Sequence, residues 1–301
     1  MKWLGVDIGG TNTKIVVLDD DSWSISDRVS IPTDRSDAAA AVKRAAEVAA
    51  EWVEHYPEIE GVGVTIPGHF DAETGRATVV PNIPGNWFDL PVRDRISDYA
   101  KRPADLINDA RAFGLAESRL GAARDAENVV ALVLGTGVGG AVILGGQLYH
   151  GRGGAAGEIG HMVLKADGPP CGCGNHGCLE ALTRSDLLAE AAGAASVAEA
   201  VSMANAGGER ARSAIDEAAR WIGLGLANVT TLLAPDVIVI GGGIAQAGEL
   251  LFRPLREELA LRSPLVLADT YQVLAASLGT DAGAMGAAIM IRNRRIAGEG
   301  S

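Results

Sequence analysis

The chain has 301 residues, of which 48% are hydrophobic and 21% are charged, and this composition excludes a protein that is disordered throughout. Asp and Glu outnumber Lys and Arg by 38 to 26, and the resulting net charge of −12 repels nucleic acids and anionic membranes, so neither is an expected partner. The sequence has no apolar run of about eighteen residues and no signal-peptide pattern, so we expect a cytoplasmic protein without a membrane span.

Strands and helices alternate in the predicted structure of the first 120 residues. Short runs rich in Val and Ile, bounded by glycine or proline, predict strands, and alanine-rich stretches with apolar residues three or four apart predict helices. The predicted strands cover residues 4–8, 13–18, 24–31, 62–66 and 104–107, the predicted helices cover 36–55, 92–101 and 109–120, and loops with short strands cover 69–91.

The same kind of pattern restarts after residue 120 and ends with a helix. A long glycine-rich segment interrupts it, and an irregular segment of that length within a compact chain is usually functional. The predicted strands cover residues 128–134, 141–144, 236–240 and 271–276, the irregular segment covers 150–178, and helices fall within 180–234, 246–261 and 281–296.

A strand, a Gly/Thr turn and a second strand occur twice, at residues 4–18 and 130–144. This weak internal duplication predicts two similar α/β domains with a cleft between them. We expect an N-terminal domain of residues 1–118, completed by the C-terminal helix 283–297, and a second domain of residues 119–282 that carries the cysteine-containing loop.

Two glycine turns are candidates for holding phosphate. In the first turn, Asp7 ends a strand and residues 9–11 follow as Gly-Gly-Thr, so backbone N–H groups and a hydroxyl lie near a carboxylate that can hold Mg²⁺. The second turn, residues 135–140, offers the same donors without an acid. Either turn alone is more often an ordinary hairpin turn, but together they favour a polyphosphate held from both sides.

The second turn also has the spacing of a dinucleotide-binding fingerprint, because Gly135, Gly137 and Gly140 form G-x-G-x-x-G. That fingerprint must open a helix. Here the apolar residues 141–144 are followed directly by Gly145-Gly146 and fit only a short strand. A nicotinamide-dependent oxidoreductase is therefore disfavoured.

Asn108 and Asp109 stand between a predicted buried strand and a predicted helix, where ligands collect in open α/β sheets. Both residue types are also preferred helix caps, so a plain cap is the alternative interpretation. Because one residue is enough to cap the helix, the other is available as a catalytic base.

The three cysteines, Cys171, Cys173 and Cys178, lie within eight residues of a Gly/Pro-rich loop. An odd number cannot form a closed disulfide set, and three thiols with one further ligand suit tetrahedral Zn²⁺. His161 is the expected fourth ligand, because His176 would strain to reach the same ion as its two neighbours. Such a closed site is structural, since no position stays open for water. The alternative is three reduced thiols without a metal.

Together these motifs resemble the ROK family (repressor, open reading frame, kinase), and the resemblance covers the whole chain. It rests on the two glycine turns, Lys14, Asn108-Asp109-Ala110, the cysteine loop with Leu179-Glu180, Ile66-Pro67-Gly68, Pro81-Asn82, Gly157-Glu158-Ile159-Gly160-His161 and Gly241-Gly242-Gly243. The resemblance implies the two-domain ribonuclease H-like fold of the actin, hexokinase and Hsp70 superfamily. It also implies ATP-dependent phosphorylation of a hexose and a homodimer or higher homo-oligomer.

The resemblance further implies roles for individual residues, with Asp109 as the general base that takes the proton from O6 of glucose. His161 would bind the sugar through one ring nitrogen and structural Zn²⁺ through the other. The implied sugar-binding residues are Gly68, Asn82, Asn108, Asp109, Glu158, His161 and Glu180. The implied contacts to ATP and Mg²⁺ are Asp7, Gly9, Gly10, Thr11, Lys14, Thr136, Gly137, Gly242 and Gly243, and the implied zinc ligands are His161, Cys171, Cys173 and Cys178.

Arg111 departs from the family pattern, because many members have Asn at this position. The sugar is therefore left open, and mannose, fructose, N-acetylmannosamine and glucosamine are alternatives to glucose. The donor is ATP or polyphosphate. A catalytically silent sugar sensor is an alternative function, although binding alone needs no base at Asp109.

We expect no DNA-binding helix-turn-helix, because the first strand begins near Lys2. We also expect a place in glycolysis.

Overall fold

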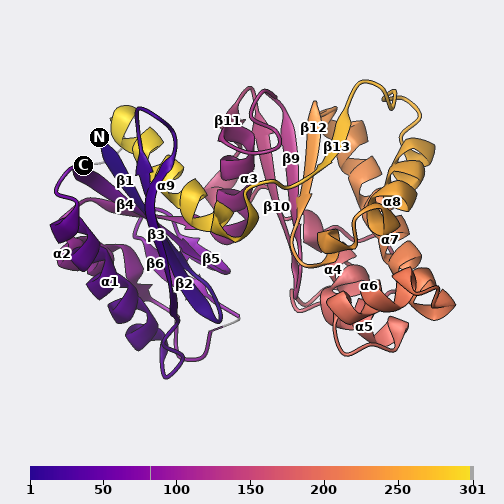
Figure 1. Cartoon of the computed structure of the whole chain (residues 1–301), viewed down its shortest axis with the longest axis horizontal. Helices are drawn as coiled ribbons and strands as arrows, with labels where there is room; N and C mark the ends of the chain where they lie inside the picture. Colours follow the sequence, from indigo (N-terminus) through magenta and orange to yellow (C-terminus); the bar gives the residue numbers. More distant parts are fainter. Residues whose placement is uncertain (82, 299–301) are drawn as a thin grey trace. The chain divides into compact units, whose positions relative to one another are not determined.

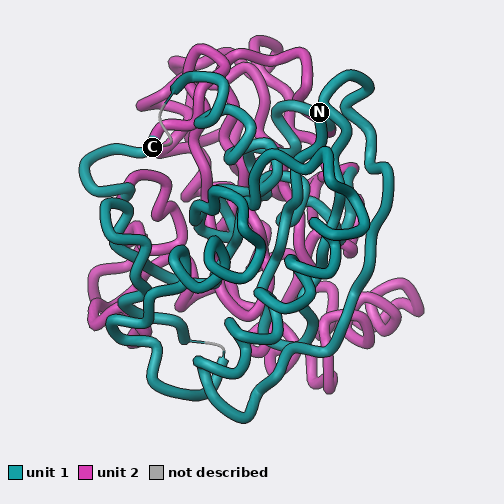
Figure 2. The backbone as a smooth tube through the Cα atoms, turned by 90° about the vertical axis from the view of Figure 1, so that its left-hand side faces the viewer, with its two compact units in different colours: residues 1–120, 150–154, 278–301 teal, residues 121–149, 155–277 magenta. Residues whose placement is uncertain are grey.

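The computed structural model of the chain describes residues 1–81 and 83–298 and is a mixed α/β structure (Figure 1). The chain divides into two compact units, which Figure 2 shows in different colours. Unit 1 comprises residues 1–120, 150–154 and those from 278 onward, and unit 2 comprises residues 121–149 and 155–277. The last helix of the chain therefore belongs to the same unit as the first strand.

Unit 1 is built on a five-stranded sheet. Its strands are β1 (Lys2–Ile8), β2 (Asn12–Asp19), β3 (Ile25–Pro32), β4 (Ile59–Ile66) and β8 (Ala104–Asn108), and they pair in the order β3-β2-β1-β4-β8. The first three strands form an antiparallel meander, and β4 and β8 run parallel to β1. A small antiparallel sheet of β5 (His69–Asp71), β6 (Arg76–Val79) and β7 (Leu90–Pro91) follows β4 in the sequence.

Helices cover both faces of this sheet (Figure 1). On one face lie α1 (Ala38–His55) and α2 (Val92–Ala100), and on the other lie α3 (Asp109–Arg119) and α9 (Ala282–Ile296). Side chains alternate between the two faces along a strand. Leu4, Val6 and Ile8 of β1 therefore enter the core beneath α1, whereas Gly5 and Asp7 face α9.

Helix α9 lies directly on the backbone of the sheet because glycines leave room for it. A Cβ atom on Gly5, or on Gly63 of β4, would collide with a backbone carbonyl of α9, that of Ala284 or that of Ala287. Gly286 allows α9 the same close approach to α3. Helix and sheet thus contact each other at a distance that a larger residue would not permit.

We expect Gly63→Ala to destabilise the protein, because the added methyl group overlaps a carbonyl of α9. Overpacking of a core costs about 1–3 kcal/mol, so the free energy of unfolding in denaturant titrations should fall by about 2 kcal/mol or more. Gly243→Ala is a matched control, since Gly243 has φ −62° and no atom lies within 4 Å of an added Cβ. Equal stability of the two variants would contradict the close contact.

Unit 2 also contains a five-stranded sheet. Its strands are β9 (Val129–Leu134), β10 (Val138–Leu144), β11 (Gln147–Leu148), β12 (Val237–Gly241) and β13 (Gln272–Ala275), and they pair in the order β11-β10-β9-β12-β13. The first three are antiparallel in succession, and β12 and β13 run parallel to β9. Unit 1 has the same arrangement, which explains the repeated strand–turn–strand pattern of the sequence.

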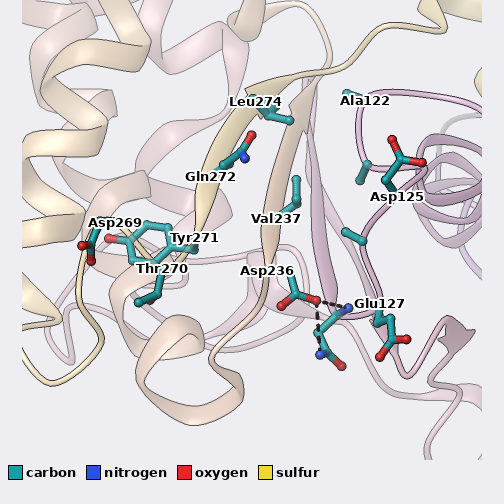
Figure 3. A pocket seen from close by; sticks show the side chains of 13 residues that line it. Ala122, Asp125, Glu127, Asp236, Val237, Asp269, Thr270, Tyr271, Gln272 and Leu274 are labelled. Atoms are coloured by element: carbon teal, nitrogen blue, oxygen red, sulfur yellow. Dashed lines mark hydrogen bonds between the residues drawn. The ribbon is translucent and has the colours of Figure 1, made fainter.

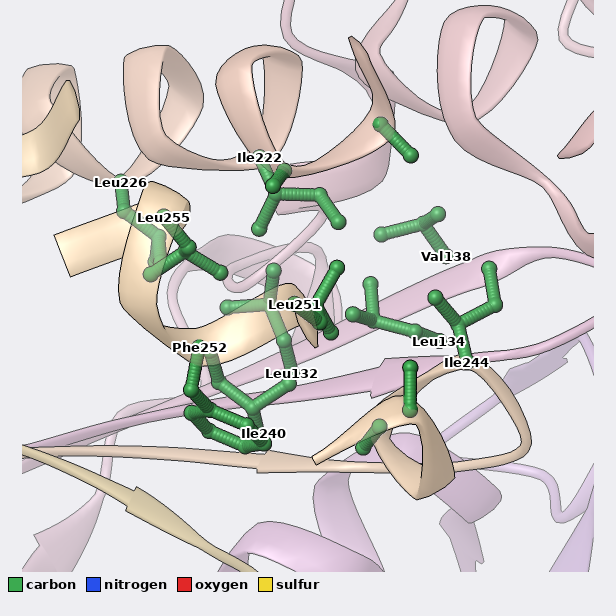
Figure 4. Packing of buried hydrophobic residues seen from close by; sticks show 14 of the residues in the cluster. Leu132, Leu134, Val138, Ile222, Leu226, Ile240, Ile244, Leu251, Phe252 and Leu255 are labelled. Carbon is green, nitrogen blue, oxygen red and sulfur yellow. The ribbon is translucent and has the colours of Figure 1, made fainter. Parts of the chain in front are cut away.

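The helices of unit 2 are α4 (Leu179–Thr183), α5 (Ser185–Ala192), α6 (Val197–Asn205), α7 (Glu209–Leu233) and α8 (Glu249–Arg262). Figure 4 shows the core that they form with the sheet, where Leu132 and Leu134 of β9 meet Ile222 of α7 and Leu251 and Leu255 of α8. All five of these side chains are fully buried. Within the described part of the chain no single helix has the length and hydropathy to cross a membrane, although one pair, 179–192 and 197–205, bent by 57°, passes that test.

The second glycine turn is shorter than the sequence predicts. The predicted turn spans residues 135–140, but β10 begins at Val138, and Gly139 and Gly140 pair with β9 as strand residues. A Cβ on Gly140 would collide with the Gly157 carbonyl, so this glycine permits a close approach of the backbone instead of a turn. A strand also follows where the dinucleotide fingerprint needs a helix.

The helix predicted at residues 246–261 is divided in the structure. A short 3₁₀ helix, η3 (Ile244–Ala247), precedes Gly248, and α8 starts only at Glu249. Gly248 has φ +57°, which a helix does not accommodate and glycine adopts readily. The helix α8 therefore begins three residues later than the sequence predicts.

Candidate active site

Asp7, near the end of β1, faces the N-terminus of α9. The Thr65 hydroxyl of β4 donates a hydrogen bond to the Asp7 carboxylate, and a Cβ on Gly283 would lie 2.7 Å from its Oδ2. Desolvation raises the pKa of Asp7, while the Thr65 hydrogen bond and the Lys14 ammonium oppose the rise. A cation beside this carboxylate would compensate for its lost hydration, so the position fits Mg²⁺.

The turn that follows Asp7, residues 9–11, is supported by the buried Thr33. Its hydroxyl donates to the Gly9 carbonyl at 2.8 Å, and its N–H donates to the Thr11 carbonyl at 2.9 Å. Lys14, expected from the resemblance to contact phosphate, donates from Nζ to the Thr280 carbonyl at 2.6 Å. Sequence reasoning missed Thr33, because a threonine at the end of a strand carries no distinctive signal.

The chain passes from β8 into α3 at Asn108 and Asp109, and the two side chains have different environments. Asn108 caps the helix, because its Oδ1 accepts from the N–H groups of Ala110 and Arg111 at 3.0 and 3.2 Å. Its Nδ2 donates to the Gly68 carbonyl at 3.1 Å. Asp109 is exposed, with Oδ1 accepting from Ala110 N–H at 2.9 Å. The cap interpretation therefore applies to Asn108, and the Asp109 carboxylate is accessible at the helix N-terminus.

Two further residues of unit 1, Gly68 and Asn82, are predicted to bind the sugar, and Arg111 departs from the family pattern. Gly68 has φ +115°, and a Cβ there would collide with the Val79 carbonyl, so glycine is required. Asn82 lies outside the described residues. Arg111 is only 6% exposed, so its departure from the family pattern places a buried guanidinium in the first turn after Asp109.

His161, Cys171, Cys173 and Cys178 form one cluster, in which all four ligand atoms lie within 4.8 Å of one another. Cys171 Sγ is 3.5 Å from His161 Nδ1, and Cys173 Sγ is 3.7 Å from Cys178 Sγ. Zn–S bonds of about 2.3 Å in a tetrahedron separate the ligand atoms by about 3.7 Å. The cluster therefore fits Zn²⁺ with His161 as the fourth ligand, while the His176 side chain is exposed.

The thiols of the cluster titrate differently. Burial raises the pKa of Cys178 to about 12 and also raises the pKa of Cys171, whereas a hydrogen bond from the Asn175 backbone lowers the pKa of Cys173. Cys171 and Cys178 are therefore protonated near neutral pH when no cation is bound. Because Zn²⁺ binds thiolates, loading releases protons, and the affinity for the metal falls as the pH falls.

Metal analysis of the purified protein should find about one Zn²⁺ per chain, as a closed Cys₃His site requires. We expect Cys173→Ser and His161→Ala to lose this metal, because each removes a ligand. His176→Ala is the matched control and should retain it. Loss of zinc from His176→Ala with retention in His161→Ala would reverse the ligand assignment, and a metal-free wild type would refute the site.

In unit 2, the residues that are expected to bind the sugar lie within this cluster or next to it. Glu158 and His161 lie at the two ends of η2 (Ile159–His161), and His161 N–H donates to the Glu158 carbonyl at 3.0 Å. Since His161 directs Nδ1 to the cluster, Nε2 is the ring nitrogen that takes no part in it. Glu180 lies in α4 with Oε1 3.7 Å from Cys171 Sγ and with Oε2 accepting from Val138 N–H at 2.9 Å.

A hollow of about 700 Å³ opens beside the turn 135–137 of unit 2. It is lined mainly by small and apolar side chains of α5 and α6, with Gly135, Gly243 and Gln246 at its edge. Gly242 has φ +90°, and a Cβ there would collide with the Leu134 carbonyl, which keeps this turn close to β9. The size and lining suit a nucleoside. Sequence reasoning missed the α5 and α6 side chains, because alanine-rich helices carry no motif.

A second hollow of about 700 Å³ lies where β9, β12 and β13 begin (Figure 3). Its lining includes Asp125, Glu127, Asp236 and Asp269, and no Lys or Arg is among the described residues that line it. Such a surface repels phosphate. The hollow beside Gly135 has a single carboxylate among the described residues of its lining, that of Asp186, and it lies at the carboxyl ends of β9 and β12, the edge of a parallel sheet where ligands usually bind.

The sequence matches the ROK family over residues 3–294. The chain belongs to the ROK family. It is 34% identical to the glucokinase of Thermotoga maritima, over 98% of this chain and 98% of that protein. The ROK hexokinase from Thermus thermophilus superposes with a TM-score of 0.86 at 35% identity, covering 97% of this chain and 100% of that one.

A further ROK structure carries ligands. The ROK family glucokinase from Streptomyces griseus, in complex with glucose and AMPPNP, superposes with a TM-score of 0.82 at 30% identity, covering 97% of this chain and 100% of that one. These similarities confirm the predicted fold class, that of the actin, hexokinase and Hsp70 superfamily.

Proposed function

We propose that this ROK protein is an ATP-dependent kinase that transfers a phosphoryl group to a hexose hydroxyl, with O6 of glucose as the acceptor. The observation that carries this proposal is the exposed Asp109 carboxylate at the N-terminus of α3, where Asn108 provides the cap. Similarity to the Thermotoga maritima glucokinase supports a glucose acceptor, and similarity to a glucokinase solved with glucose and AMPPNP supports both glucose and ATP.

In the proposed reaction, the acceptor oxygen forms a bond to the γ-phosphorus as the bond from that phosphorus to the ADP oxygen breaks. Asp109 takes the proton of the attacking hydroxyl. Aspartate is a weak base, which is sufficient when the transition state is loose and the proton leaves late. The helix N-terminus favours the ionised carboxylate that this step needs.

The proposed nucleotide contacts use backbone N–H groups, because the chain is acidic. The turns at residues 9–11 and 135–137 would bind phosphate oxygens, with the hydroxyls of Thr11 and Thr136 as further donors. Mg²⁺ held by Asp7 would screen the charge of the polyphosphate, and ATP is preferred to polyphosphate because the hollow beside Gly135 and Gly243 suits a nucleoside. Gly9, Gly10, Lys14, Gly137 and Gly242 complete the proposed set.

The proposed sugar contacts are polar groups with complementary hydrogen-bonding roles. The carboxylates of Glu158 and Glu180 accept hydrogen bonds from hydroxyl groups, and the amide of Asn108 and the ring of His161 donate them. Zn²⁺ on His161 and the three cysteines would fix the orientation of that ring. Gly68 and Asn82 are also proposed to contact the sugar. A catalytically silent sugar sensor would not need the Asp109 carboxylate as a general base.

We expect Asp109→Asn to lower kcat at least about 100-fold, because general-base catalysis contributes about 10²–10⁴-fold. The KM for glucose and the melting temperature should stay near those of the wild type. A coupled assay of ADP release measures the rate. Asp94→Asn is the matched control, since Asp94 is an exposed carboxylate in the first turn of α2. A near wild-type rate in Asp109→Asn would contradict the role.

A panel of hexoses with ATP and Mg²⁺ tests the substrate. Glucose should have the highest kcat/KM among glucose, mannose, fructose, N-acetylmannosamine and glucosamine, because the similar enzymes are glucokinases. A higher kcat/KM for another hexose would reassign the sugar. Calorimetric binding of a sugar without phosphorylation of any hexose would favour the sensor instead.

Three broader properties stay predictions. A homodimer or higher homo-oligomer and a place in glycolysis, as the step that phosphorylates glucose before its breakdown, follow from the family resemblance, and a cytoplasmic location follows from the sequence pattern. The net charge of −12 agrees with a kinase that has no nucleic-acid or membrane partner.

A further inference from the structure

Glu180 connects the metal cluster with the turn proposed to bind phosphate. It lies in α4, two residues after the ligand Cys178, which is fully buried. One carboxylate oxygen, Oε1, is 3.7 Å from Cys171 Sγ, and the other, Oε2, accepts from Val138 N–H at 2.9 Å. Val138 directly follows the turn 135–137, so one side chain spans from a metal ligand to the end of the turn.

The chain just beyond α4 contacts the same turn. Ser185, the first residue of α5, donates from its N–H to the Gly135 carbonyl at 2.9 Å. Hydrogen bonds with Glu180 and with Ser185 therefore hold the turn at both its ends, and these two residues are joined by α4, which begins directly after Cys178. Leu179 fixes this helix in the core, since it is fully buried and packs against Gly225 of α7.

The turn is also shaped to admit the Glu180 carboxylate. A Cβ on Gly137 would lie 2.6 Å from Oε2 of Glu180, so a larger residue would push the carboxylate away from Val138 N–H. Glycine at this position thus allows the contact, besides leaving the backbone open to phosphate. Gly135, at the other end of the turn, lines the hollow proposed for the nucleoside.

We propose that Glu180 is a positioning residue for the nucleotide, in addition to its proposed contact with the sugar, and that metal in the cluster sets the shape of the turn 135–137 through it. A bound ion fixes Cys171 and Cys178, and with them α4 and Glu180. The carboxylate then holds Val138 N–H, and the turn with it, in one orientation. Metal loading therefore raises the affinity for nucleotide. This inference rests on the proposed function, because that function assigns the turn to phosphate.

Calorimetric titration with AMPPNP and Mg²⁺ tests the coupling, using protein loaded with Zn²⁺ or depleted of it by a chelator. Wild type should bind AMPPNP about tenfold more tightly when loaded, within the usual range of coupling between two sites. Glu180→Gln should keep this response, because its amide oxygen reaches Val138 N–H as the carboxylate does. Glu180→Asp keeps the charge but is one methylene too short, so both its loaded and depleted forms should bind as depleted wild type does.

Two controls separate positioning from a general loss of structure. Glu190→Gln alters an exposed carboxylate on the neighbouring α5 and should behave as wild type. Melting temperatures of all variants are measured as well, because a purely structural role would lower them without removing the response to zinc.

The inference would be overturned if Zn²⁺ raised the affinity of Glu180→Asp for AMPPNP tenfold. It would also be overturned if loaded and depleted wild type bound AMPPNP with equal affinity. Wild type that binds no AMPPNP in either state would instead refute the proposed function, and the coupling with it. The two failures are therefore distinguishable.

Discussion

The contact of α9 with the backbone of the unit 1 sheet is the constraint on which the candidate catalytic groups of that unit depend. At Gly5 and Gly63 no side chain separates the strands from the helix, so the backbone of α9 lies directly on the sheet at these two points. Asp7 lies on the same face of β1, and the contact that fixes α9 also places Gly283 against its carboxylate. Helix α3, whose first residue is Asp109, packs against α9 in turn. A displaced α9 would therefore move the surroundings of both carboxylates.

The two hollows of unit 2 are similar in size but differ in charge. The lining of one includes four carboxylates, and the lining of the other includes one, that of Asp186. Backbone dipoles bind an anion well only when the turn that carries them is rigid. The hydrogen bonds of Ser185 and Glu180 supply that rigidity at residues 135–138, as Thr33 does at residues 9–11.

The sequence predicts the long elements well, because burial of Leu, Ile and Val imposes a period on them. It also brings His161 together with the three cysteines, since the number and type of ligands leave few alternatives. The division of roles between Asn108 and Asp109 was not predictable, because both suit a cap and only the geometry decides. The roles of Gly140 and Gly248 were also not predictable. Gly140 permits a close approach of the backbone within a strand, and Gly248 permits a break between two helices. Contacts such as that of Glu180 with Val138 join residues distant in sequence and leave no local signal.

The position of α9 at the far end of the chain has a consequence for biosynthesis. The sheet of unit 1 is complete once residue 108 has emerged from the ribosome, but the part of its face that receives α9 stays uncovered until residues 282–296 follow. Unit 2 occupies most of the sequence in between, so it is able to close its own core first, although domains usually fold in order from the N-terminus. Throughout that interval, the strand surface around Gly5 and Gly63 lacks the helix that covers it in the folded protein. The unit whose first strands are translated earliest is therefore the last to be completed.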